Sequence, residues 1–350
     1  HDLSEVIHQK TNGNAFVLRL FLEKLISSEV LMICPTKDLH SGNNASRRWT
    51  WDLEQVSARS SESTGLLLAA KVLQLPRNLQ ELLKVASCLG YAFQVNDLKL
   101  VVTSLHTSDL TEVSASPVNE ITETIILNML KSAEMAGVVA ASRRLRTFEF
   151  THDRVYDAVH ETVGNGLGRD LLYLKLGRCL AASNDDDESV DSEISAYLIT
   201  SLLNQGSSRM CQFERIALAR RNLTTAKDAL AKCAFDRATE FVHRGISLVP
   251  KDAMWMEEYD LALELHTVAA QLASVRGSPD DFANEVIIHG RCFRDRLPAY
   301  ITKIDFLGWT GHFDDAMSLG LDFLEQLGET IPRKPSKVRV AYEWAMTKQT

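Results

Sequence analysis

Residues 148–161 read FEFTHDRVYDAVHE and decide how the middle of this chain is expected to fold. The first three residues alternate apolar and polar side chains, which predicts a short strand. A polar turn, Thr151-His152-Asp153, follows, and Thr151 or Asp153 can cap a helix because their side-chain oxygens accept hydrogen bonds from its free first-turn amides. Small and apolar side chains then recur on one helical face, at Val155, Ala158, Val159 and Thr162. The stretch therefore predicts a strand, a turn and an amphipathic helix.

The composition indicates a mostly α-helical protein of more than one domain. The chain has 350 residues, of which only 17 are glycine and 8 are proline. A formal net charge of −8 argues against a general nucleic-acid scaffold, which would carry a basic face. The six cysteines are scattered without metal-ligand spacing, which favours a reducing compartment and no metal site. Neither a signal peptide nor an apolar run of membrane-spanning length occurs, so we expect a cytoplasmic protein with no membrane contact.

Residues 1–31 predict two helices separated by a polar turn at 11–14. The second of these helices is strongly apolar, which predicts that it is packed against other elements. The chain starts at His1, without an initiator methionine and inside an expected helix. We therefore expect it to be a piece of a larger protein.

Residues 32–64 predict a linker, because they are rich in serine and asparagine and lack helical periodicity. Aromatic and polar residues alternate at 48–53, which predicts a short strand or an ordered plug within this linker. Trp49 and Trp51 lie in this segment. We expect both indoles to be buried against the preceding helices, as large aromatic side chains usually are.

Residues 65–163 predict several helices and one β-hairpin. Apolar periodicity, with proline and glycine at some of the ends, predicts helices over 66–73, 76–89, 95–102 and 118–136. Two short strands, 138–140 and 147–150, predict the hairpin. Its tip carries Arg143, Arg144 and Arg146.

Residues 164–350 predict a run of helical hairpins after an acidic loop at 184–191. Similar helix starts occur around Ala238, Ala283 and Ala316, where small side chains allow helices to approach closely. The first interval is 45 residues and the second is 33, and only the second is near the tetratricopeptide period. We predict degenerate tetratricopeptide-like repeats that form an α-solenoid, whose concave side binds protein partners.

Two turns resemble motifs of signal-transduction ATPases with numerous domains (STAND ATPases, a branch of the AAA+ class). They are His152-Asp153, after a strand, and Gly13-Asn14, before an apolar helix. In plant immune receptors of this class the first turn reads Met-His-Asp, and its histidine senses the β-phosphate of bound ADP. The resemblance implies that His152 and Asp153 report nucleotide state. It implies also that Gly13, Asn14 and Ala15 form a lid motif, with Ala15 where the family has a proline against the base.

The resemblance covers most of the chain and divides it into four parts. They are the C-terminal part of an AAA+ lid (1–31), a linker (32–64), a winged-helix domain (65–163) and the tetratricopeptide-like repeats (164–350). The fold class that it implies is mostly α: a winged helix with a small β-hairpin, followed by an α-solenoid. Similar helical regions follow the ATPase in large multidomain sensor kinases and serine/threonine kinases.

The chain lacks the residues that nucleotide hydrolysis requires. No GxxxxGK[ST] phosphate loop is present, so we expect no enzyme activity and no cofactor in this segment. ATP or ADP would bind elsewhere in the full-length protein. Four histidines recur at equal intervals, but no glycine-flanked serine lies near them, so hydrolase chemistry is not indicated; they are His243, His266, His289 and His312.

Three functions stay open at this point. The first is a regulatory segment that couples nucleotide state to protein partners and to the protein's own ATPase and output domains. The second is a transcription regulator that contacts DNA phosphates through Arg143, Arg144 and Arg146. The acidic residues at 118–136 argue against DNA as a partner, because the phosphates that flank the major groove would repel their carboxylates. The third is a plain interaction scaffold with a vestigial ATPase.

Overall fold

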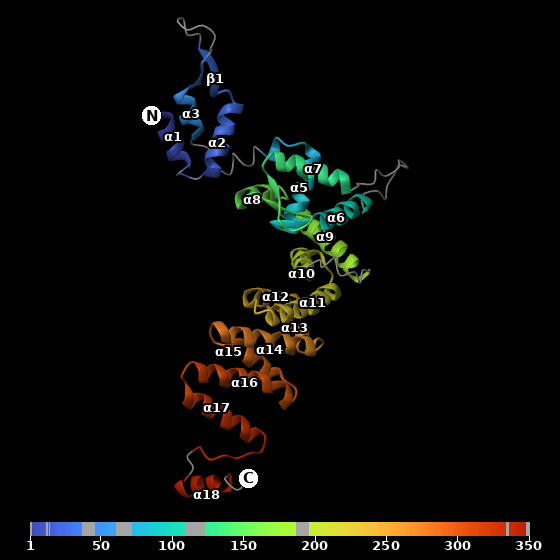
Figure 1. Ribbon diagram of the computed structural model, residues 1–350. Coiled ribbons are helices and arrows are strands. Elements are labelled where there is room, and N and C mark those ends of the chain that lie inside the picture. Colours follow the sequence, from blue (N-terminus) through green and yellow to red (C-terminus); the bar gives the residue numbers. More distant parts are fainter. Residues whose placement is uncertain are drawn as a thin grey trace. The chain divides into compact units, whose positions relative to one another are not determined.

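The computed structural model describes residues 2–11, 13, 15–36, 46–60, 72–108, 123–186, 196–333 and 336–347. It is mostly helical with two small antiparallel sheets, which confirms the expected mostly α composition (Figure 1). The chain divides into two compact units, His1–Ile194 and Ser195–Thr350.

The first unit begins with two helices and a β-hairpin. In chain order its elements are α1 (Asp2–Thr11), α2 (Ala15–Ser27), β1 (Leu31–Thr36), β2 (Ser46–Trp51) and α3 (Leu53–Ser60). The two helices match the prediction for 1–31. Phe21, Leu25 and Val56 are fully buried in a common core, so α3 packs with α2. The Asp52 carboxylate caps α3, accepting from the Glu54 amide at 3.0 Å.

The prediction of a linker over 32–64 missed half of this hairpin. β2 lies where a short strand was expected, but its partner β1 was not predicted. The expected burial of the two tryptophans was wrong, since Trp49 and Trp51 are each 45% exposed. The register pairs Ile33 with Trp49 and Leu31 with Trp51, so both indoles lie on one face of the ribbon. On that face Leu31 is buried, whereas Ile33 is exposed.

The rest of the first unit is a helical body with a three-stranded sheet. Its elements are α5 (Arg77–Leu89), β3 (Ala92–Gln94), α6 (Val95–Ser108), α7 (Glu123–Met135), β4 (Val139–Ala141), β5 (Thr147–Phe150), α8 (Asp153–Glu161) and α9 (Leu167–Asp186). The strand order is β3-β5-β4, all antiparallel, so β5 is the central strand. Phe150 is fully buried, with its ring 5.8 Å from that of Phe93.

Several boundaries in this body differ from the predictions. The hairpin β4–β5 is confirmed, whereas β3 was not predicted. α9 continues through Asp186, beyond the expected start of an acidic loop at 184. The predicted helix at 66–73 and the start of the helix at 118–136 fall largely outside the described residues. Thr162 was expected on the buried face of its helix, but it is exposed at the C-cap, where its hydroxyl donates to the Val159 carbonyl at 2.6 Å.

The second unit is a succession of helices. They are α10 (Ala196–Gln205), the short 3₁₀ helix η1 (Ser207–Arg209), α11 (Gln212–Ala231), α12 (Phe235–Leu248), α13 (Lys251–Met254), α14 (Tyr259–Arg276), α15 (Asp280–His289), α16 (Phe293–Trp309), α17 (Phe313–Gln326) and α18 (Lys337–Thr347). α11 packs on α12, α14 on α15, and α16 on α17. α12 also contacts α14, and α15 contacts α16, so each helical hairpin packs on the next (Figure 1).

Two of the three alanines that were expected at close helix approaches, Ala238 and Ala283, are fully buried, whereas Ala316 is half-buried. A β-carbon added at Gly245 would lie 2.8 Å from Cδ2 of Leu265, which is inside van der Waals contact. A larger residue at 245 would therefore separate α12 from α14.

Candidate functional site

His152 is the N-cap of α8, just after the central strand β5. Its backbone is extended, with φ of −160° and ψ of 147°, and its Nδ1 accepts a hydrogen bond from the Arg154 amide at 3.1 Å. The prediction that Thr151 or Asp153 caps this helix was therefore wrong. The Thr151 hydroxyl instead donates to the Gly137 carbonyl at 2.9 Å, and Asp153 is the exposed first residue of the helix.

The turn is fixed to its surroundings by backbone hydrogen bonds on both sides. The Thr151 amide donates to the Val138 carbonyl at 3.1 Å, and the Phe150 amide donates to the Tyr91 carbonyl at 3.0 Å. On the helix side, the His152 carbonyl accepts from the Val155 amide at 2.9 Å. The sheet and the helix together set the position of His152.

The cap bond also sets the chemistry of the imidazole. Because Nδ1 accepts from a backbone amide, the proton of the neutral ring lies on Nε2. An N–H at Nε2 can donate to an oxygen of an anion such as phosphate. The neighbouring N-terminus of α8 adds a partial positive charge, whereas the Asp153 carboxylate opposes a bound anion. The residue as a whole is half-buried.

The other residues of the predicted nucleotide site lie on different elements. Gly13 is exposed between α1 and α2, with a left-handed φ of +75° that favours glycine. Ala15 is the first residue of α2, and Asn14 lies outside the described residues. The structure thus brings His152 and Asp153 together at one helix start, and it places Gly13 and Ala15 at another.

A buried polar cluster next to the turn was missed by the sequence reasoning. At its centre is His160, near the end of α8, whose side chain forms hydrogen bonds with Ser87 of α5 and Tyr173 of α9. Its Nδ1 is 3.3 Å from the Ser87 hydroxyl, and its Nε2 is 3.0 Å from the Tyr173 hydroxyl and 3.3 Å from the Arg169 guanidinium. The Tyr156 ring stacks on His160 with centroids 5.3 Å apart. The cluster therefore links α8 to α5 and to α9.

Burial favours the uncharged form of each titratable group in this cluster. Burial, and then the nearby Arg169 charge, lower the pKa of His160. Burial raises the pKa of Tyr173 to about 12 and that of the Cys88 thiol to about 11. At neutral pH the imidazole is therefore uncharged, and the phenol and the thiol are protonated, so neither a phenolate nor a thiolate is present. The spacing of Tyr156 and His160, four residues apart on one helix, was the signal that could have found it.

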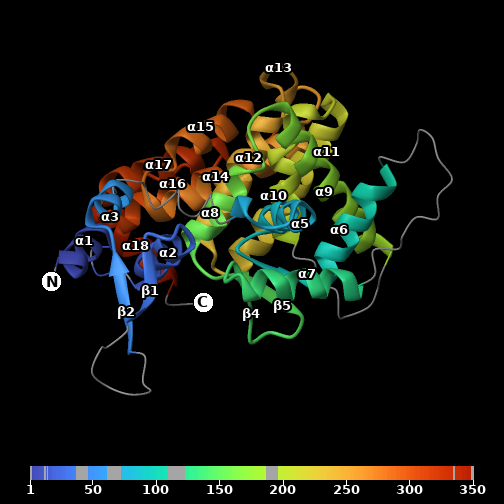
Figure 2. The same ribbon diagram turned by 90° about the horizontal axis from the view of Figure 1, so that it is seen from above.

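The arginines at the β4–β5 turn do not act as one basic patch. Arg143 and Arg144 are exposed where this turn projects from the helices (Figure 2). Arg146 instead pairs with Glu123 at 3.1 Å and donates to the Asn96 side chain at 3.4 Å. One of the three predicted DNA contacts is therefore engaged within the protein, beside an acidic residue.

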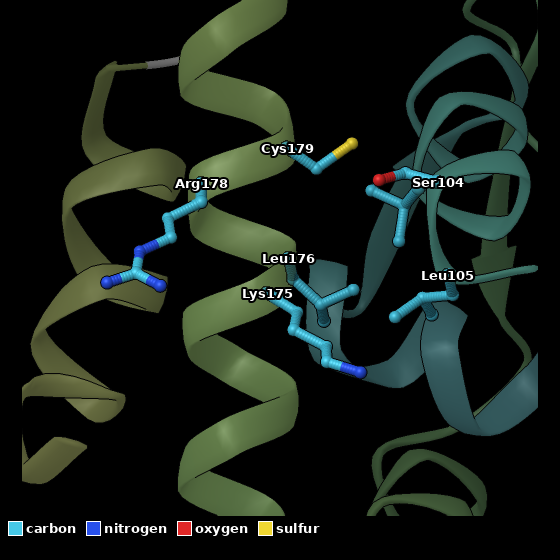
Figure 3. Close-up of a pocket in the computed structure, with 7 residues that line it drawn as sticks. Ser104, Leu105, Lys175, Leu176, Arg178 and Cys179 are labelled. Carbon is cyan, nitrogen blue, oxygen red and sulfur yellow. The ribbon is translucent and has the colours of Figure 1, made fainter. Parts of the chain in front are cut away.

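A cavity of about 290 Å³ lies between α6 and α9 (Figure 3). Ser104 and Cys179 approach each other across it, and Arg178 points away on the far side of α9. The Cys179 thiol lies 3.7 Å from the Leu100 carbonyl. The titratable lining residues of the cavity are Lys175, Arg178 and Cys179.

Among the residues that the structure describes, no three histidine, cysteine, aspartate or glutamate side chains are grouped as ligands for a metal ion. None of the helices in this described part of the chain combines the length and the apolar character that crossing a bilayer needs.

Comparison with known proteins gives one distant relationship. The chain is 21% identical, over an alignment of 373 positions, to hybrid signal transduction histidine kinase G of Dictyostelium discoideum. The alignment covers 93% of this chain and 10% of that protein, so the chain spans about a tenth of the length of the curated protein that it matches. No family model and no solved structure matches the sequence.

Proposed function

We propose that this chain is a regulatory, non-catalytic segment of a STAND-type signalling ATPase in the cytoplasm. In this proposal the body with the three-stranded sheet is a winged helix that reports the nucleotide state of an ATPase module elsewhere in the full-length protein. The helical hairpins of the second unit are tetratricopeptide-like repeats that bind protein partners. The segment itself performs no chemistry and holds no cofactor of its own.

The observation that carries the proposal is the geometry of His152. The residue follows a central strand, its Nδ1 is engaged as a helix cap, and its Nε2 therefore carries the N–H. A donor held between a sheet and a helix can bind a phosphate oxygen from another domain and transmit its presence to both elements. Gly13 and Ala15 would belong to the lid of that ATPase.

Two further findings support a signalling role. The aligned protein of Dictyostelium discoideum is named a signal transduction histidine kinase, and the alignment runs along nearly all of this chain. The second unit packs hairpin on hairpin from α11 to α17, which is the arrangement that repeat proteins use to present an extended binding surface.

The test is the release of a fluorescent ADP analogue from the full-length protein. His152→Ala removes both the cap and the N–H donor, whereas His152→Ser keeps a side-chain oxygen that can cap α8 and removes only the imidazole donor. We expect both variants to release ADP about ten- to a hundredfold faster, because a hydrogen bond to a charged group contributes about 1.5–3 kcal/mol.

Thermal unfolding of the 350-residue chain separates the two roles of His152. The alanine variant should lose about 1 kcal/mol of stability, and the serine variant should stay close to the wild type. If His152→Ser releases ADP at the wild-type rate, His152 has only a structural role. If the full-length protein binds no ADP at all, the scaffold alternative replaces the regulatory one.

A further inference from the structure

The unequal repeat spacing of the second unit produces a pocket. Ala238 and Ala283 begin equivalent helices 45 residues apart, 12 more than the next interval. Most of the extra length lies between α12 and α14, where the chain forms the short helix α13 and Trp255 follows it. A cavity of about 670 Å³ lies beside this insertion, lined by α12, α13, α14 and α15. Its volume is in the range of ligand-binding pockets.

Aromatic rings form much of the wall of this cavity. The His289 ring stacks on Trp255 with centroids 4.7 Å apart and planes inclined by 7°. The His266 ring lies 5.0 Å from Trp255 and 6.2 Å from Phe282. Three of the four equally spaced histidines thus gather here, because His243 stacks on Phe282 from α12.

The two histidines that line the cavity present hydrogen-bond acceptors. His266 is only 5% exposed, and its Nδ1 donates to the Ala262 carbonyl at 2.8 Å. His289 likewise donates from Nδ1 to the Glu285 carbonyl at 3.1 Å. In each neutral ring the lone pair therefore lies on Nε2. Within residues 196–333, all of which are described, no hydrogen-bond partner reaches Nε2 of His266.

The charge balance of the lining favours a cation. Asp281 and Glu285 bring two carboxylates, against the single ammonium group of Lys251. Burial lowers the pKa of His266, so this ring adds no positive charge at neutral pH. A metal ion is not the natural occupant, since no group of three possible ligands is close enough among the described residues.

We propose that this pocket binds an arginine side chain of a partner protein. A guanidinium is planar, carries five N–H donors and stacks on aromatic rings, so it matches acceptor nitrogens, carboxylates and ring faces at once. Lysine fits less well because its ammonium group is compact and strongly hydrated. The inference rests on the protein-binding part of the proposed function and names the chemistry that one partner presents.

The test titrates the 350-residue chain with the peptide acetyl-Ala-Ala-Arg-Ala-Ala-amide in a calorimeter. Two matched peptides carry citrulline, which has nearly the same shape without the charge, or lysine in place of arginine. We expect the arginine peptide to bind with a Kd on the order of 1 mM, as suits one anchoring side chain. The citrulline peptide should bind at least tenfold more weakly, and the lysine peptide should lie between them.

Glu285→Gln should weaken arginine-peptide binding about tenfold, because it removes a carboxylate without changing the shape of the pocket. Glu325→Gln on α17, an exposed carboxylate that does not line the cavity, should leave binding unchanged. Circular dichroism confirms that both variants are folded. Equal binding of the citrulline and arginine peptides, no binding of either, or wild-type affinity in Glu285→Gln would each overturn the assignment. No nucleotide is involved, so a negative result here is distinct from a negative result at His152.

Discussion

Asp97 carries a charge that works against folding. The carboxyl group lies in the first turn of α6, and burial raises its pKa to about 6. Because the folded-state pKa lies above the unfolded value of 3.8, this group destabilises the fold as pH rises through that window. Its position at a helix N-terminus offsets part of the cost, since a negative charge there gains about 0.3–1 kcal/mol.

Asp97→Asn should therefore stabilise the chain above pH 7 by about 2 kcal/mol, after the loss of the helix-dipole term. At pH 4 the gain should be several-fold smaller, because the unfolded-state pKa of 3.8 has only just been passed and a large share of the unfolded chains still hold the proton that the folded chain keeps. Chemical denaturation at pH 8 and pH 4 measures both limits. Equal effects at the two pH values would show that the benefit does not come from the buried charge.

His160 has the opposite dependence on pH. Its pKa is lowered from the ordinary value of 6.5, so below 6.5 the unfolded chain binds more protons than the folded one. The stability that depends on the neutral ring is complete above pH 6.5 and is lost as pH falls through the folded-state value. Burial acts on His266 in the same direction.

We expect His160→Gln to reduce the fall in melting temperature between pH 7 and pH 5.5. Part of the slope should remain, because His266 still titrates. His8→Gln is the matched control, since His8 is exposed on α1, and it should follow the wild type. A wild-type slope in His160→Gln would remove His160 as the source.

At the residue scale, local sequence located the turn but not the cap. Ser, Thr, Asp and Asn are the usual caps, so Thr151 and Asp153 were the rational choices. The Thr151 hydroxyl is instead taken by the Gly137 carbonyl, which lies 14 residues earlier in the sequence. This hydrogen bond is a tertiary contact that competes with helix capping for the Thr151 hydroxyl, and the local sequence does not indicate it. In the cluster around His160, only the Tyr156–His160 pair has a local spacing, whereas the partners on α5 and α9 are also brought in by tertiary structure.

At the scale of elements, helix packing in the second unit depends on Gly245. Gly245→Ala would push a β-carbon against Leu265, which is fully buried, and should cost about 1–3 kcal/mol of stability. Gly308→Ala is the matched control, because it adds the same methyl group to a helix where nothing lies within 4 Å. That change should be neutral or stabilise by up to about 1 kcal/mol. Denaturant midpoints compare the two, and equal effects would mean that α12 and α14 can separate without cost.

Long, periodic elements were predictable, and short or paired ones were not. The amphipathic helices and the β4–β5 hairpin followed from apolar spacing and local turns. β3 is very short, and its partner β5 comes only after α6, α7 and β4, so nothing in its own sequence marks it as a strand. β1 ends in a proline and a threonine, and its pairing with β2 is what makes it a strand.

At the scale of the whole molecule, the division into two units has a direct test. One core cluster lies within 21–56, and two others lie within 219–299. Residues 195–350 made alone should therefore be helical and unfold cooperatively, because their apolar contacts come from within the unit. Circular dichroism and a thermal melt suffice. A fragment that is unfolded, or that melts without a transition, would show that this unit depends on the first.

The irregular repeat spacing was visible in the sequence, but its meaning was not. The 45-residue interval read as degeneracy, whereas the structure uses the extra residues to form α13 and to position Trp255. A departure from a repeat period is thus worth examining as a candidate site. The same holds for the histidines, whose spacing carried no information until their rings were seen against Trp255 and Phe282.

The central position of β5 also determines the order in which the strands can pair during translation. Phe148 pairs with Ala141 across one short turn, but it also pairs with Phe93, which precedes α6, α7 and β4 in the chain. Closing the longer loop costs about 2 kcal/mol more in chain entropy, so the β4–β5 hairpin should form first. On the ribosome, β3 waits roughly 3–11 s for its partner, at typical rates of synthesis. During that time Phe93 is exposed to water, and only the arrival of β5 ends this vulnerable interval.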